Sequence, residues 1–138
     1  MSTLDSPSLE VRWDGPRATL LVDGAESSCI DTSDPTYLDF EYMQHATCAL
    51  QATFPSSAPL RVLHLGGAAC ALPWAWSLLF PSSRHTVVEI SPKIASFARE
   101  TFDLPRSPIL KIRIGEARAV IDSLRGSSFD VIVRDAFA

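Results

Sequence analysis

The sequence predicts an α/β fold: a parallel sheet with helices packed on it, preceded by a small antiparallel β-meander. From residue 61 onward, short apolar runs rich in valine and isoleucine alternate with helical patterns, which is typical of βαβ units. Before residue 34, three strand-like runs are separated by turns that contain Asp-Gly, which is typical of hairpins. With 138 residues, 46% of them hydrophobic, the chain can bury a sizeable core.

The N-terminal part is expected to hold the meander and one helix. A helix is predicted to begin at Asp34 and to continue to about residue 52, because apolar side chains recur at helical spacing. Two prolines in the segment 55–59 then mark a boundary, which divides the chain into parts 1–54 and 55–138. The expected meander strands are 9–13, 18–22 and 28–30.

The second part is expected to form the parallel sheet. The predicted strands are 61–65, 86–90, 109–114 and 129–133, and the predicted helices are 72–80, 93–102 and 116–124. Helix 116–124 should turn Val120 and Ile121 inward, and His64 is expected to be a buried core residue. The sequence stops where a further helix is expected, so the sheet is interpreted as incomplete. The exposed edge of strand 129–133 then favours pairing with a second copy, as a dimer.

Composition narrows the range of partners. The formal net charge of −4 argues against a nucleic-acid binder, which needs a basic surface. Three cysteines without a C-x-x-C spacing indicate a reducing compartment, and the three histidines lack metal-ligand spacing, so no metal is expected. Without a leader peptide or an apolar run of about 18 residues, the predicted location is cytoplasmic, with no membrane partner.

Glycines and small residues follow the first predicted strand of the sheet. Gly66, Gly67 and Ala68 form a tight turn before a helix, where backbone N–H groups can face a ligand. The full G-x-G-x-x-G pattern is missing, so the turn is either a cofactor turn or an ordinary connection between a strand and a helix.

Acidic residues end three of the predicted strands. Glu89 lies 23 residues after Gly66, near the spacing of the carboxylate that binds ribose hydroxyls, although it is also placed to cap a helix. Asp135 should face the same crevice, where it would hold or deprotonate a substrate amine, or simply end a strand. Glu116 would either reach a base edge or stabilise a helix N-terminus.

Four motifs in this order resemble the spermidine/spermine synthase family and the wider class I S-adenosylmethionine-dependent methyltransferase fold, which is Rossmann-like. They are VLHLGGAAC, VVEISP with Glu89, GEAR from Gly115 to Arg118, and FDVIVRD ending at Asp135. The segment VDGAESSCIDTSDPTYLDFEYM also resembles the small N-terminal sheet and linking helix of that family. On this resemblance, part 55–138 is a nucleoside-binding domain.

The resemblance implies a role for each site residue. The donor would be S-adenosylmethionine or decarboxylated S-adenosylmethionine, and Asp135 would help to deprotonate an attacking amine. The implied catalytic residue is Asp135, and the implied nucleoside-binding residues are Gly66, Gly67, Ala68, Glu89, Ile90, Glu116 and Ala117.

The chain also departs from the family pattern. Ala68 and Cys70 replace later glycines of the turn, where they would crowd the ligand or reshape the loop. Ser27 replaces a glutamine, Phe40 takes the place of a tyrosine, and Ala138 replaces the second aspartate of D-x-x-D. Two hypotheses follow: an aminopropyl- or methyltransferase acting on a small nucleoside and an amine, or a non-catalytic homologue that serves in binding or self-association.

Overall fold

The structure is a computed structural model that describes residues 7–67, 69–124, 126 and 128–135. Its N-terminal part is the predicted meander, an antiparallel sheet in the order β1-β2-β3. The predicted strand 28–30 begins earlier, at Ala25, because the tight Asp23-Gly24 turn joins it directly to the strand before. The strands are β1 (Leu9–Asp14), β2 (Arg17–Val22) and β3 (Ala25–Asp31).

The first helix is α1 (Glu41–Thr53). It was predicted to begin at residue 34, so it starts seven residues later than predicted. The side chain of Asp34 accepts hydrogen bonds from the backbone N–H and the hydroxyl of Thr36. An aspartate that bonds to the chain two residues further on favours a turn over a helix. The prediction of a helix start at Asp34 was therefore wrong.

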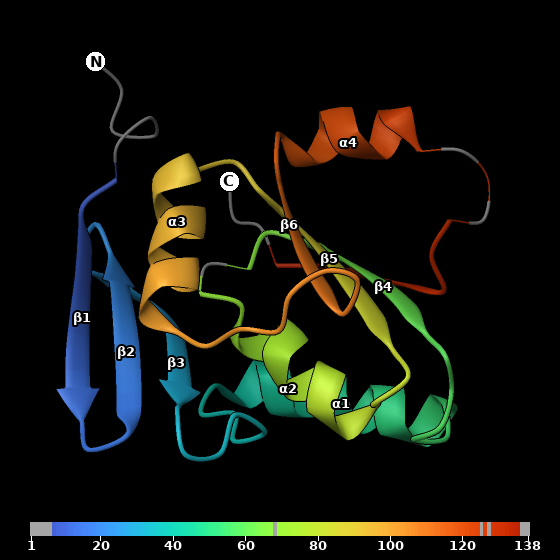
Figure 1. Cartoon of the computed structure of the whole chain (residues 1–138), viewed down its shortest axis with the longest axis horizontal. Helices are drawn as coiled ribbons and strands as arrows, with labels where there is room; N and C mark the ends of the chain where they lie inside the picture. The colour runs from blue at the N-terminus through green and yellow to red at the C-terminus, as the bar shows by residue number, and fades with distance from the viewer. Residues whose placement is uncertain (1–6, 68, 125, 127, 136–138) are drawn as a thin grey trace.

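The second part is a four-stranded parallel sheet in the order β6-β5-β4-β7. The last strand lies beside the first one of this sheet, so the strand order reverses next to β4 (Figure 1). Ligands of open α/β sheets bind at such a switch point, beyond the carboxyl ends of the strands. The elements are β4 (Arg61–Leu65), α2 (Ala71–Leu79), β5 (Arg84–Glu89), α3 (Pro92–Thr101), β6 (Leu110–Ile114), α4 (Ala117–Ser123) and β7 (Val131–Arg134).

Helices cover both faces of this sheet. Val62 and Val87 belong to the main core, which also holds residues of α1, α2, α3 and the meander. Leu63 and Val88 face the other way, into a small cluster with Val120 of α4. Ile121 was expected to point inward, but 42% of it is exposed, because the short α4 turns only its Val120 side to the sheet.

A buried polar chain crosses the main core. The Nε2 atom of His64 lies 2.9 Å from Nδ1 of His85, whose Nε2 lies 2.7 Å from the hydroxyl oxygen of Ser83. All three residues are at most 2% exposed, and burial lowers the pKa of both imidazoles, to about 4 for His85. The prediction that His64 is a core residue is confirmed. In the described part of the chain, no helix has the length and apolar character needed to cross a membrane.

Candidate functional site

A cavity of about 770 Å³ opens beyond the carboxyl ends of the parallel strands. Gly66 follows β4, Glu89 ends β5, Glu116 follows β6, and Asp135 follows β7, and all four line the cavity. The meander and the start of α1 supply further lining residues. A cavity of this size holds a ligand as large as a nucleoside with a substituent.

The structure gathers the sequence-predicted site residues around this one cavity. Ala68 lies outside the described residues, as does Ala138. Those that line the cavity are Gly66, Gly67, Glu89, Ile90, Glu116, Ala117 and Asp135. Their predicted binding and catalytic roles stay predictions.

The turn after β4 brings the backbone close to the cavity. Gly66 has a positive φ of 84°, and its N–H donates to the carbonyl of Val88 over 2.8 Å. A Cβ on Gly67 would lie 3.1 Å from a methyl of Val87, so the chain passes tightly over β5. Cys70 also has a positive φ, 68°, but its side chain is buried in the core and does not line the cavity. Cys70 therefore does not crowd this space.

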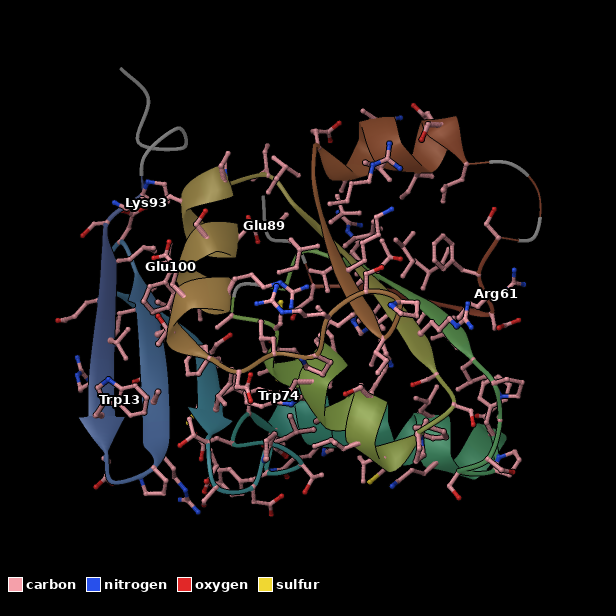
Figure 2. All side chains as sticks on the ribbon, in the orientation of Figure 1. Trp13, Arg61, Trp74, Glu89, Lys93 and Glu100 are labelled. Atoms are coloured by element: carbon pink, nitrogen blue, oxygen red, sulfur yellow. The ribbon has the colours of Figure 1, made fainter. Side chains whose placement is uncertain are left out.

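Glu89 is held at the end of β5, beside the first turn of α3 (Figure 2). Only 8% of the residue is exposed, and its Oε2 accepts a hydrogen bond from the backbone N–H of Ser91 over 3.0 Å. Ser91 in turn caps α3, since its hydroxyl accepts from the N–H of Ile94. The carboxylate is therefore fixed in orientation at the cavity wall.

Glu116 caps helix α4. Its two carboxylate oxygens accept hydrogen bonds from the backbone N–H groups of Arg118 and Ala119, at 3.0 and 2.9 Å. These two bonds lower the pKa of Glu116. Of the two interpretations of this residue, stabilisation of a helix N-terminus is observed, while a contact to a base edge remains a prediction.

Asp135 is paired with a residue that sequence reasoning missed. The hydroxyl of Tyr42, in the first turn of α1, donates to Asp135 Oδ1 over 3.0 Å. Burial raises the pKa of Asp135, and the hydrogen bond from Tyr42 opposes that rise. The pKa of Tyr42 is raised, mainly by burial and also by the carboxylate, so the phenol stays protonated and remains a donor. Phe40 lines the cavity as well, but the hydroxyl that reaches Asp135 comes from Tyr42.

Three consecutive residues of β3, Ala25, Glu26 and Ser27, also line the cavity. Regular alternation along a strand would send neighbours to opposite faces. Here, however, Leu20 pairs with Ser28 and Leu21 with Glu26, so Ser27 is the extra residue of a β-bulge. The bulge was not foreseen, because register shifts leave no clear composition signal in a strand of this length.

The charged side chains among the described residues that line the cavity are all acidic. Four carboxylates line the cavity, whereas none of the described residues that line it is a lysine, arginine or histidine. No group of three or more histidine, cysteine, aspartate or glutamate side chains among the described residues has the arrangement of a metal site.

Comparisons with known proteins agree with this arrangement. No family model matches the chain. It is 38% identical to a probable spermidine synthase of Corynebacterium glutamicum, with a TM-score of 0.87 over 96% of this chain and 50% of that one. It is also 30% identical, over 70% of its length and 33% of the relative's, to the polyamine aminopropyltransferase of Vibrio vulnificus. Human methyltransferase-like protein 13, solved in complex with SAH, is 26% identical with a TM-score of 0.65, over 72% of this chain and 49% of that one.

The parallel sheet, the meander and the cavity at the strand ends define a Rossmann-like protein of the methyltransferase fold. Its similarity to these proteins supports a spermidine-synthase-like family for the chain. It spans about half the length of the Corynebacterium protein and a third of the Vibrio enzyme.

Proposed function

We propose that the cavity binds S-adenosylmethionine or its decarboxylated form, and that the chain serves a spermidine-synthase-like transfer of an aminopropyl or methyl group to an amine. The observation that carries the proposal is the shared cavity of Gly66, Glu89 and Asp135 at three strand ends. The similarity to a methyltransferase-like protein solved with SAH supports a ligand of the nucleoside-sulfur type.

The nucleoside would be held by the ends of β5 and β6. A ribose diol supplies two donors, and the carboxylate of Glu89, already oriented by Ser91, has the acceptors to receive them. Ile90 lines the cavity with 61% of its surface exposed, so it offers an apolar surface to the face of a base.

Asp135 is proposed as the base for the amine. In aminopropyl transfer, the amine nitrogen bonds to the carbon next to the sulfonium, the bond from that carbon to sulfur breaks, and methylthioadenosine leaves with the electron pair. The proton of the attacking nitrogen passes to Asp135. A carboxylate with a raised pKa is the better base, and the Tyr42 hydroxyl keeps it oriented.

Calorimetric titration tests this proposal. The wild-type chain is titrated with S-adenosylmethionine, decarboxylated S-adenosylmethionine and methylthioadenosine, and we expect micromolar binding of at least one. Glu89→Ala should weaken it by about tenfold or more, because hydrogen bonds to a charged group contribute roughly 1.5–3 kcal/mol. Glu100→Ala, on the exposed side of α3, is the matched control and should bind like the wild type.

Circular dichroism and thermal unfolding of each variant show whether the fold is intact. Wild-type protein that binds none of the three ligands would contradict the proposal and support a non-catalytic, self-associating module instead.

A further inference from the structure

The carboxylates that line the cavity differ in what they already bind. Both oxygens of Glu116 cap α4, Glu89 accepts from Ser91, and Asp135 accepts from Tyr42. Glu26 is exposed, and its carboxylate makes no hydrogen bond or ion pair with another described residue. Glu26 is therefore the carboxylate of this wall whose charge is not already engaged by the protein.

The position of Glu26 is set by the tight Asp23-Gly24 turn, which pairs Val22 with Ala25 and Leu21 with Glu26. The bulge follows directly at Ser27, and both Glu26 and Ser27 line the cavity. Bulges are frequent beside binding sites. The local backbone therefore presents Glu26 to a ligand.

We infer that Glu26 is a specificity-determining residue that selects ligands with a positive charge next to the nucleoside. A sulfonium or ammonium group in this cavity would meet Glu26 without competition from a cationic side chain among the described lining residues. This inference rests on the proposed function, because it assumes that the nucleoside lies against the ends of β5 and β6.

Two ligands that share the nucleoside and the sulfur but differ in charge, one with and one without the aminopropyl group, test this role. Decarboxylated S-adenosylmethionine carries a sulfonium and an ammonium, whereas methylthioadenosine keeps the nucleoside and the sulfur but is neutral. Glu26→Gln keeps the size of the side chain and removes its charge. Because an ion pair near the surface contributes up to about 1 kcal/mol, the variant should bind the cationic ligand up to about fivefold more weakly and methylthioadenosine as well as the wild type does.

The control is Glu10→Gln. Glu10 on β1 pairs with Leu21, and Leu21 pairs with Glu26, so the two glutamates lie in one row across the meander, but Glu10 does not line the cavity. Glu10→Gln should leave both affinities unchanged. The effect of Glu26→Gln should also shrink at about 1 M salt, where charges are screened beyond about 3 Å.

Equal losses for both ligands in Glu26→Gln would assign the residue a role in shape or folding and overturn the inference. No loss for either ligand would overturn it as well. If the wild type binds neither ligand, the proposed function fails together with this inference. If the wild type binds both ligands and Glu26→Gln binds them equally well, only the role of Glu26 is refuted.

Discussion

Acid should destabilise this protein through the buried pair of His64 and His85. Burial lowers the pKa of both imidazoles in the folded chain, to about 4 for His85, and the neighbouring His85 ring lowers the pKa of His64 further. In the unfolded chain, both return to an ordinary pKa of about 6.5. Below pH 6.5 the unfolded state therefore binds protons that the folded state does not bind. The stabilising contribution is complete above this pH and is lost as the pH falls toward 4.

The size of the effect follows from the shift at His85. A pKa lowered from 6.5 to about 4 corresponds to about 3.4 kcal/mol when the loss is complete, and to about 2 kcal/mol at pH 5. His64 shifts in the same direction and adds to this loss. Domains of this size unfold at a cost of roughly 5–15 kcal/mol, so His85 alone removes a substantial share.

Urea unfolding at several pH values between 8 and 5 measures this loss directly. Asp135 acts in the opposite direction, since its raised pKa favours the folded state as the pH falls, so the series is repeated with Asp135→Asn. An unfolding free energy that stays constant from pH 7.5 to pH 5 in the Asp135→Asn protein would refute the reasoning.

Three further predictions concern single residues. Because Cys70 has a positive φ, Cys70→Gly should be more stable than Cys70→Ala by about 1 kcal/mol in thermal unfolding; equal stability would contradict this. Tyr42→Phe removes the hydrogen bond that lowers the pKa of Asp135, so the carboxyl should titrate at higher pH by NMR, and a shift to lower pH would argue against the pairing. If β7 pairs two copies of the chain, light scattering should show a dimer. Ile132→Lys, at a residue of β7 that is 56% exposed, should convert this dimer to a monomer, whereas a monomeric wild type would contradict pairing through β7.

The sequence predicts the fold well because its signals are local. Every predicted strand is present, since apolar and β-branched runs between turns are typical of strands. The errors occur where a local signal has two interpretations. Asp34 is as suitable for a turn as for a helix start, and its own hydrogen bonds to Thr36 decide for the turn. Ile121 fits a helical stripe, but the short α4 leaves it exposed.

Only the part of the candidate site that the parallel sheet supplies is predictable from the sequence. Residues that follow parallel strands meet at one edge of the sheet, so Gly66, Glu89 and Asp135 could be expected to share a cavity. Tyr42 and Glu26 reach the same cavity from the N-terminal part, and Tyr42 is 93 residues distant in sequence from Asp135, to which it bonds. No periodicity encodes how a meander and a helix pack against a separate sheet.

The residues that depart from the family pattern differ in how they affect the cavity, as the backbone structure shows. Cys70 keeps the positive φ that favours glycine and turns its side chain into the core, so the loss of that glycine does not count against a ligand. The position of Phe40 keeps an aromatic wall while Tyr42 supplies the hydroxyl. Ser27, in contrast, lies in the cavity wall at the β-bulge, directly beside Glu26. We therefore expect this chain's ligand preference to be set at the meander wall rather than at the glycine turn.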